Sequence, residues 1–364
     1  MRQAAALFCL LSLLPALPSR ADPLRVASFN AELQRDGPGL LLRDLGREGD
    51  KQIAAVVAVM AQADADVLAL QGIDWDYDGR TLAALAERLA AAGVPYPHRL
   101  ALRPNSGLAS GLDLDGDGKP GGPGDSQGYG RYTGQGGIAV LSRYPIVTEA
   151  VQDFSALLWR DLPGARLPVF PDGRPFPSAE AQAAQRLSTT GHWVVPIALP
   201  GGDTLSLLTF QAGPPVFDGP EDRNGRRNAD EIRVWQLYLD GALGPAPAPR
   251  FVLAGGANLD PADGAGRHRA IAALLADPRL QDPRPASAGA AQAGDQGHAG
   301  PDALDTVDFD GPGRLRVDYV LPSTDWKVEA AGVLWPAAGA PGHDTALAAS
   351  RHRLVWVDLR ADQP

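Results

Sequence analysis

Amphipathic helical segments alternate with short apolar strands in the first part of this chain, and that alternation limits the folds it can adopt. Residues 24–29 alternate apolar and polar side chains as a strand does, and residues 66–70 form a short apolar run. Residues 51–63 and 81–92 carry apolar side chains at helical spacing. Helices that each bury one face must cover a sheet, so we expect a layered fold of strands and helices.

Strands outnumber helices in the rest of the chain. One further helix is expected over residues 230–239, after a polar run at 221–228. The further expected strands are residues 138–141, 204–210, 251–253, 317–321 and 354–359. Long loops separate these elements, at residues 103–135, 155–190, 211–229 and 284–313. Loops of that length usually carry function or are disordered.

Composition agrees with a folded protein of this kind. The chain has 364 residues, of which 45% are hydrophobic and 21% are charged, so it has enough apolar side chains for a core and differs from a disordered sequence. Its 42 glycines and 33 prolines favour many turns and exclude a coiled coil.

Residues 1–21 have the features of a secretory signal peptide. Arg2 supplies a charged start, an apolar stretch follows from residue 4 to residue 16, and Ser19 and Ala21 place small residues before a cut. The alternative, a membrane anchor, needs about 20 apolar residues, and this run is shorter. We therefore expect residues 22–364 to form a single exported domain, periplasmic or extracellular, with no membrane span after cleavage.

The mature chain is expected to lack cysteine and to be acidic. Cys9 lies within the signal, which excludes disulfides, thiolate catalysis and cysteine-based metal sites. Cleavage removes two arginines and no acidic residue, and this moves the formal net charge from −10 to −12. Nucleic acid is therefore an unfavourable partner, because like charges repel at long range. Oligomeric state has no signal in the sequence.

Seven short motifs follow one another in a set order. They are Asn30 after the first strand, LQ at 70–71, GIAVLS at 137–142, PPVFDG at 214–219, GGAN at 255–258, RVDY at 316–319 and SRH at 350–352. From about residue 24 to residue 360 the sequence resembles the endonuclease/exonuclease/phosphatase superfamily, and GPEDRNGRRN at 219–228 is similar to its secreted bacterial branch. The resemblance implies an α+β fold, the DNase-I-like four-layer αββα sandwich, with a site where strand ends meet in a cleft.

The resemblance also implies metal-assisted phosphoester hydrolysis, but this chain departs from the pattern at the chemical positions. The family's metal-binding Glu corresponds to Gly72, its His after the middle strand to Gln211, its water-orienting Asp to Gly256, and the Asp before its final His to Arg351. A hard cation needs oxygen ligands, and Arg351 is a permanent positive charge. We therefore expect no catalytic metal and little or no hydrolysis.

Part of the family's site is kept. Asn30 and Asn258 match its phosphate-polarising amides, and Asp318 matches the acid that holds the catalytic His, which is His352 in this chain. One interpretation is a residual pocket in which these groups and Arg351 bind a phosphate-containing or other anionic ligand without metal. The other is structural: the kept residues tie loops together, and Arg351 neutralises acidic groups left in the cleft.

Carboxylates near the lost positions leave an active enzyme open as the alternative. Asp74 and Asp76 follow Gly72 at alternate positions of an extended segment, and Asp344 precedes Arg351. With these as ligands, the protein is a Mg²⁺-dependent phosphodiesterase or phosphatase. Each lost position would need its own accurately placed replacement, so we favour a pseudoenzyme.

The run DLDGDG at 113–118 matches the opening of a calcium-binding loop. Asp113, Asp115 and Asp117 occupy ligand positions 1, 3 and 5, and a glycine at position 6 permits the turn. Position 12 is Gly124 instead of Glu, and Asp125 comes one residue late. A structural Ca²⁺ site and a metal-free loop of Asx turns both fit. The first adds a third role, that of a non-catalytic, calcium-ordered scaffold or partner-binding protein.

Two further segments, residues 221–228 and 285–303, are expected to be loops. The run at 221–228 carries Arg223 and Arg226, which are candidate ligand-binding residues, although a salt-bridged loop that anchors the cleft wall is the simpler interpretation. Residues 285–303 are rich in Ala, Gly and Gln and are expected to form a mobile surface loop. Neither segment identifies the substrate or ligand.

Overall fold

The computed structural model describes residues 23–361. The expected signal peptide at residues 1–21 lies outside the described residues. Within residues 23–361, no helix has the length and apolar character needed to cross a membrane.

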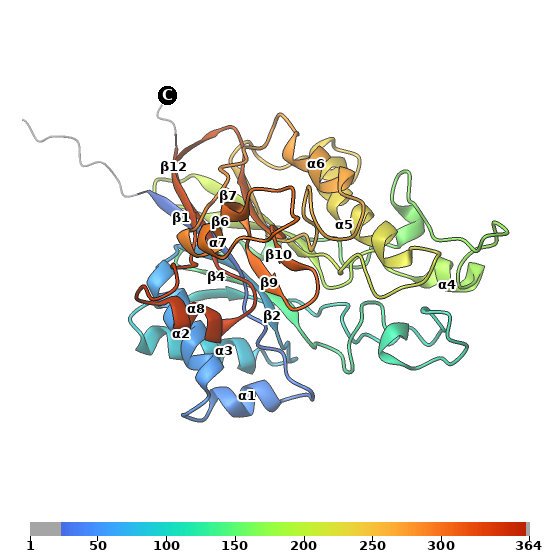
Figure 1. The fold of residues 1–364 in the computed structure, drawn as a ribbon, viewed down its shortest axis with the longest axis horizontal. Helices are drawn as coiled ribbons and strands as arrows, with labels where there is room; N and C mark the ends of the chain where they lie inside the picture. The colour runs from blue at the N-terminus through green and yellow to red at the C-terminus, as the bar shows by residue number, and fades with distance from the viewer. Residues whose placement is uncertain (1–22, 362–364) are drawn as a thin grey trace, which may run out of the picture.

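Two sheets form the centre of the molecule (Figure 1). The six-stranded sheet has the order β12 (Trp326–Val333), β13 (Val355–Ala361), β1 (Leu24–Asn30), β2 (Val67–Ile73), β4 (Gly137–Ser142) and β3 (His98–Leu100). The five-stranded sheet has the order β11 (Asp318–Pro322), β8 (Phe251–Gly256), β7 (Thr204–Gln211), β6 (His192–Ala198) and β5 (Gln152–Asp153). A separate antiparallel pair is formed by β9 (Val307–Phe309) and β10 (Gly313–Leu315).

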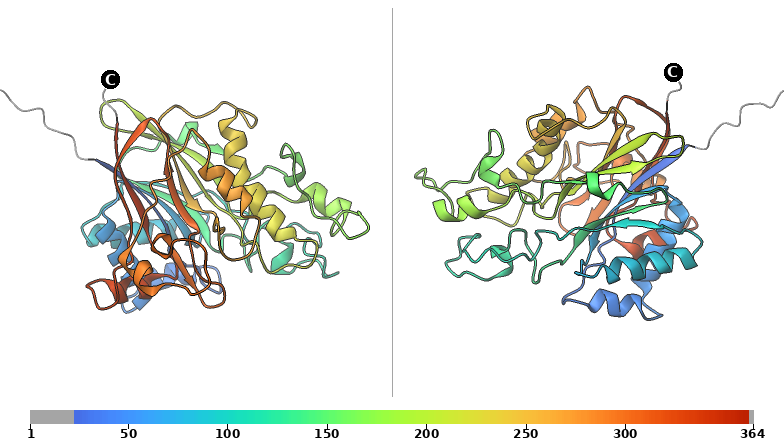
Figure 2. Two further views of the ribbon diagram at one scale, coloured as in Figure 1. Left: turned by 45° about the horizontal axis from the view of Figure 1, so that its top comes forward. Right: turned by 180° about the vertical axis from the view of Figure 1, so that it is seen from behind.

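Helices cover the outer face of each sheet, on opposite sides of the strands (Figure 2). The six-stranded sheet is covered by α1 (Leu40–Leu45), α2 (Lys51–Ala63), α3 (Arg80–Ala91) and α8 (His343–Ala349). The five-stranded sheet is covered by α5 (Arg223–Leu239) and α6 (Arg269–Leu275). The short helices outside these layers are α4 (Ala179–Ala184), α7 (Ala288–Ala293), η1 (Pro123–Asp125), η2 (Thr148–Ala150), η3 (Trp159–Asp161) and η4 (Asp302–Leu304).

The side chains of each strand alternate between two cores, and this produces the layers. In β1, Phe29 packs in the core under α1 to α3, whereas Val26 packs in the core between the two sheets. In β7, Leu207 packs between the sheets and Leu208 packs under α5 and α6. Successive strand residues point to opposite faces, so each sheet contributes to two cores. The expected four-layer αββα sandwich is confirmed.

The structure corrects one loop prediction at residues 221–228. Helix α5 begins at Arg223, within the run that was expected to be a loop before a helix at 230–239. Its first turns contain the buried side chains of Arg227 and Asn228. Arg227 donates to the backbone carbonyls of Leu187 and Arg186, and Asn228 donates to Gly213 and Ala257. Polar residues that satisfy backbone carbonyls inside the protein look, in sequence, like residues exposed to water.

A second correction concerns residues 285–303, which were expected to form a mobile surface loop. Ser287 accepts a hydrogen bond from the amide of Ala290 and caps helix α7. Ala290 is fully buried in the core between the two sheets. A small residue suits this close packing. The segment is thus partly helical, while residues 291–303 are exposed or half-buried, and its mobility stays a prediction.

His192 joins β6 to α5 inside the protein. Its ring packs against Phe210 and Trp235, with ring centroids 5.2 and 5.4 Å away. Its Nε2 lies 3.0 Å from the carbonyl of Glu231, and its Nδ1 lies 2.8 Å from Ser188 Oγ. Burial lowers the pKa of His192 to about 4. The imidazole is therefore neutral in the folded protein at neutral pH.

We predict that acid destabilises the fold partly through His192. Between about pH 6.5 and pH 4 the unfolded chain takes up a proton that the buried ring does not, and this lowers the free energy of unfolding by as much as about 3 kcal/mol. Urea denaturation of the wild type and of His192→Gln at several pH values measures the contribution. The variant should show a smaller loss on acidification, and equal pH dependence in the two proteins would contradict the prediction.

Candidate functional site

The ends of three strands in the five-stranded sheet bring predicted site residues into one row. Gln211 at the end of β7 pairs with Gly256 at the end of β8, and Gly256 pairs on its other side with Asp318 at the start of β11. Asn258 follows shortly after β8 in a left-handed backbone conformation. Its Nδ2 donates to the carbonyl of Ala212 at 2.7 Å. The positions singled out in this sheet therefore lie side by side.

The six-stranded sheet contributes Asn30 and Gly72 from neighbouring strands. Asn30 ends β1, and Gly72 lies in β2 at a bulge where the register with β4 shifts. A cavity of about 450 Å³ is lined by Asn30, Gly72 and Gln211 together with Glu32. The two sheets thus bring their predicted residues together at one cavity, as the expected cleft requires.

Glu32 is an acidic residue of this cavity that the sequence motifs did not single out. Its carboxylate accepts hydrogen bonds from Arg351 Nε at 2.9 Å and from the Arg351 backbone amide at 2.8 Å, and also from Ser350 Oγ at 3.0 Å. Burial alone would raise the pKa of Glu32, but hydrogen bonds from Arg351 outweigh it and the pKa is lowered. The ion pair is therefore formed at neutral pH. The sequence feature that could have identified Glu32 as a site residue is its position two residues after Asn30.

Arg351, the ion-pair partner of Glu32, corresponds to the family's Asp before its final His. Its guanidinium also lies over the ring of Phe309, 5.3 Å from the ring centroid. Hydrogen bonding to Glu32 raises its pKa. The side chain is 55% exposed, and its Nε and backbone N–H are engaged by Glu32. This arrangement agrees with the neutralising role weighed for Arg351 in the sequence.

His352 and Asp318 form the expected pair. Their Nδ1 and Oδ2 atoms lie 2.7 Å apart, and Thr306 Oγ1 donates to the same carboxylate oxygen at 2.9 Å. Both residues are buried. Neither residue lines the cavity at Asn30. The pair ties β11 to the segment before β13.

Gly72 has no room for a side chain. Its φ is +72°, a left-handed conformation that favours glycine. A Cβ atom there would lie 2.5 Å from Asn30 Oδ1 and 2.8 Å from the amide nitrogen of Glu32. The family's carboxylate at this position therefore cannot be restored without moving the backbone.

Gly256 is crowded by its cross-strand neighbour. A Cβ atom on Gly256 would fall well inside van der Waals contact with the side-chain amide of Gln211. Gln211 Oε1 is buried and has no hydrogen-bond partner among the described residues. The glutamine amide thus lies in the space that a side chain at position 256 would enter.

The three carboxylates that could replace the lost metal ligands are either hydrogen-bonded to backbone amides or located outside the cavity at Asn30. Asp74 is buried and accepts the backbone amides of Arg35 and Gly136, both at 3.0 Å. Asp76 accepts the amides of Arg80 and Thr81 at the start of α3. Asp344 lies exposed in the first turn of α8. None of the three lines the cavity at Asn30.

The residues around Asn30 do not fit a Mg²⁺ ion. Magnesium needs near-octahedral oxygen ligands, usually including one or two carboxylates. Two carboxylates line this cavity, and Glu32 is paired with Arg351 while Asp36 forms an exposed ion pair with Arg131. A guanidinium held against the buried carboxylate repels a divalent cation from it.

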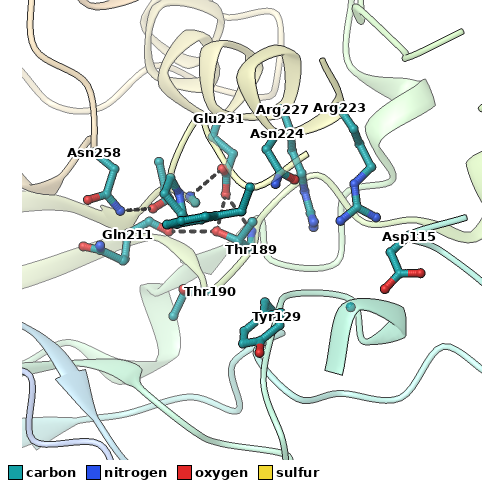
Figure 3. Close-up of a pocket in the computed structure, with 15 residues that line it drawn as sticks. Asp115, Tyr129, Thr189, Thr190, Gln211, Arg223, Asn224, Arg227, Glu231 and Asn258 are labelled. Atoms are coloured by element: carbon teal, nitrogen blue, oxygen red, sulfur yellow. Dashed lines mark hydrogen bonds between the residues drawn. The ribbon is translucent and has the colours of Figure 1, made fainter. Parts of the chain in front are cut away.

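A second, larger cavity adjoins the first and shares Gln211, Thr190 and Tyr129 with it. Its volume is about 670 Å³, and it also contains Asn258 and Arg223. Figure 3 shows Tyr129 and Asp115 across this cavity from the residues of α5. Of the predicted arginines, Arg223 lines this cavity and donates to the carbonyl of Leu114, whereas Arg226 does not line it and donates to Glu221.

Glu231 on α5 fixes one wall of the larger cavity. Its carboxylate accepts the amides of Thr189 and Gly213 at 2.6 and 2.8 Å, and the Thr189 hydroxyl at 2.8 Å (Figure 3). Burial raises the pKa of Glu231 to about 7, although Arg227 opposes this shift. Because its oxygens are engaged with the protein, Glu231 shapes the cavity and does not offer a free base.

The three aspartates of the calcium-like loop do converge. One carboxylate oxygen from each of Asp113, Asp115 and Asp117 lies within 4.8 Å of the others. Asp115 and Asp117 also accept the amides of Asp117 and Lys119, two residues on, as Asx turns do. Asp113 accepts the amides of Gly116 and Gly118. Oxygen donors at this spacing fit a Ca²⁺ ion, and the same hydrogen bonds hold the loop without one. Occupancy of this site stays a prediction.

Comparison with known proteins confirms the family resemblance. A model of the Endonuclease/Exonuclease/phosphatase family matches residues 27–352. No curated protein matches the sequence significantly.

Solved structures share the fold at low sequence identity. An endonuclease/exonuclease/phosphatase from Beutenbergia cavernae is 19% identical with a TM-score of 0.55, and the match covers 94% of this chain and 72% of that one. A family protein from Leptotrichia buccalis is 15% identical with a TM-score of 0.51, covering 93% and 99%. Sphingomyelinase C from Streptomyces griseocarneus is 18% identical with a TM-score of 0.50, covering 93% and 100%. Identities this low show the fold and leave the substrate open.

We predict that Gly72→Ala is much more destabilising than Gly79→Ala. Both glycines have a similar left-handed backbone, but a Cβ at Gly79 meets nothing within 4 Å. The control should lose about 1 kcal/mol of unfolding free energy, and Gly72→Ala about 3 kcal/mol because crowding is added. Chemical denaturation measures both, and equal losses would show that position 72 accommodates a side chain.

Proposed function

Because this chain belongs to the Endonuclease/Exonuclease/phosphatase family, we propose that it is a family member that has lost metal-dependent phosphoester hydrolysis and binds a ligand in its cleft without cleaving it. The observation that carries this proposal is the ion pair between Glu32 and Arg351. Arg351 pairs with the half-buried carboxylate of Glu32 in this cavity. The family's chemistry instead requires a divalent cation between carboxylates, and the arginine would repel such a cation.

The other lost positions support the same proposal through packing. Gly72 has no space for the missing glutamate, and the amide of Gln211 fills the space beside Gly256. Glutamine does not titrate near neutral pH, so Gln211 provides no general base. The changes at Gln211 and Gly256 are in direct contact, and Gly72 packs against Asn30 and Glu32, so the altered positions belong to one tightly packed region.

An active enzyme with displaced ligands is the alternative. It requires Asp74, Asp76 or Asp344 to reach the cavity at Asn30, and each of these is held or exposed elsewhere. Mg²⁺ would bind there only after Arg351 released Glu32. We therefore favour the pseudoenzyme.

The anionic ligand expected from the sequence stays a prediction. Of the three candidate arginines, Arg223 lines one of the two cavities, although one of its donors is engaged with the carbonyl of Leu114. We further propose export, on the basis of the signal-like residues 1–21, and no nucleic-acid partner, on the basis of the net charge of −10.

We predict no EDTA-sensitive turnover by the purified protein. The substrates are bis(p-nitrophenyl) phosphate and sphingomyelin, each assayed with Mg²⁺, with Mn²⁺ and with EDTA. Sphingomyelinase C from Streptomyces griseocarneus serves as the positive control for sphingomyelin. Mg²⁺-dependent turnover that Gln211→Ala abolishes would show that the cleft is catalytic and refute the proposal.

Two variants of Arg351 test whether its charge is what keeps a metal ion out of the cavity. Arg351→Asp places a second carboxylate next to Glu32 and should gain Mn²⁺ binding in calorimetric titration, whereas Arg351→Ala removes the cation without adding a ligand and should gain much less. Binding of Mn²⁺ by the wild type, with an affinity equal to that of Arg351→Asp, would show that the ion pair does not exclude the metal.

We propose a separate structural role for Ca²⁺ at Asp113, Asp115 and Asp117. Ca²⁺ should raise the melting temperature of the wild type, and Mg²⁺ should do so less because it requires a tighter octahedron. Asp117→Asn should lose this stabilisation, while Asp78→Asn, which changes an exposed acid outside the loop, should keep it. No melting-temperature shift with Ca²⁺ in the wild type would leave the loop as a set of Asx turns.

A further inference from the structure

The larger cavity has a rim of exposed aromatic rings. Within residues 23–361, the exposed large hydrophobic side chains are Tyr77, Tyr129, Val169, Phe217 and Leu347. Two of the five, Tyr129 at 71% exposure and Phe217 at 88%, line this one cavity. Single exposed apolar residues are ordinary, but two at one cavity mark a surface that a ligand can cover.

Phe217 is also held in an unfavourable backbone conformation. Its φ is +69°, in the left-handed region that bulky residues rarely adopt. The neighbouring segment is anchored, because Asn224 Nδ2 donates to the carbonyl of Val216 at 2.7 Å. Phe217 is 88% exposed, so in the isolated protein its packing does not offset the cost of this backbone conformation. Strain of this kind is typical of ligand-contacting positions.

The buried charges of the cavity wall are already satisfied. Arg227 donates to the backbone carbonyls of Leu187 and Arg186, both at 2.8 Å. Glu231 accepts the amides of Thr189 and Gly213. Neither charge is free to attract an ion of opposite sign.

The remaining charges of the wall, Asp115 and Arg223, have opposite signs. Burial lowers the pKa of Arg223, and Asp115 is the largest of the charges that oppose this shift. A ligand with a net charge gains attraction from one of the two and repulsion from the other. The wall therefore favours a neutral ligand that both donates and accepts hydrogen bonds.

We propose that this cavity binds a neutral sugar ring. The apolar C–H face of the ring packs on Tyr129 and Phe217, and its hydroxyls, which each donate and accept, meet Arg223 and the side-chain oxygen of Asn258, whose Nδ2 is held by Ala212. The volume of about 670 Å³ lies in the range of small-molecule sites. This proposal replaces the anionic ligand expected from the sequence with a neutral one for the larger cavity, and it rests on the non-hydrolytic function proposed above.

The test is binding of the full-length protein to an array of mono- to tetrasaccharides, followed by calorimetric titration with a sugar that it retains. Tyr129→Ala should weaken binding by about tenfold, because an aromatic anchor is truncated. Tyr77→Ala is the matched control: its ring is 90% exposed and does not line the cavity. The control should bind like the wild type.

Phe217→Gly separates a ligand role from a structural one. Glycine adopts a φ of +69° without strain, so this variant should unfold at a higher temperature than the wild type while binding the sugar less tightly. A ring that serves the fold would show the opposite effect on unfolding.

Three results would overturn the proposal. They are retention of no sugar by the array, equal effects of Tyr129→Ala and Tyr77→Ala, and binding of inorganic phosphate or adenosine in place of sugar. Each is distinguishable from failure of the proposed function, which shows as EDTA-sensitive turnover and is measured separately.

Discussion

The pairing of Glu32 with Arg351 determines what this cleft can do. It joins the loop after β1 to the segment before β13, and Ser350 and the Arg351 backbone amide complete the shell of the same carboxylate. Because a half-buried carboxylate left unpaired is costly, the arginine stabilises the fold at this point. The same contact disfavours a cation beside that carboxylate, which is the basis of the non-hydrolytic function proposed above.

Helix α5 gives the cleft its shape from the other sheet. Arg227, Asn228 and Glu231 satisfy backbone groups of the loops around residues 186–189 and 213 and the turn after β8. Thr189 and Gly213 of these loops line the larger cavity, so polar side chains of one helix hold part of its wall. The polar motif at 219–228 that resembles the secreted branch of the family is thus a structural anchor for the cleft wall.

Periodicity predicted individual helices and strands of the fold, whereas the four-layer arrangement was implied by the family resemblance. Helix α2 has the bounds expected from apolar spacing, and β1 and β7 each extend one residue beyond the expected strands. Strand β6 and helix α5's first turns were not predicted, since His192 and Arg227 are buried through hydrogen bonds that connect distant segments. For the site, aligned motifs identified Gly72 and Arg351. Glu32 was missed because its role depends on a left-handed turn and on a partner more than 300 residues away.

The contact between Gly256 and the Gln211 amide limits what can change at position 256 alone. The two positions are cross-strand neighbours, so a side chain returning at 256 meets an occupied space unless the glutamine rotates away or is replaced first. A side chain at position 256 therefore requires a change in the rotamer or the identity of residue 211. Because Gln211 Oε1 has no hydrogen-bond partner among the described residues, rotation of this amide breaks no hydrogen bond of that oxygen.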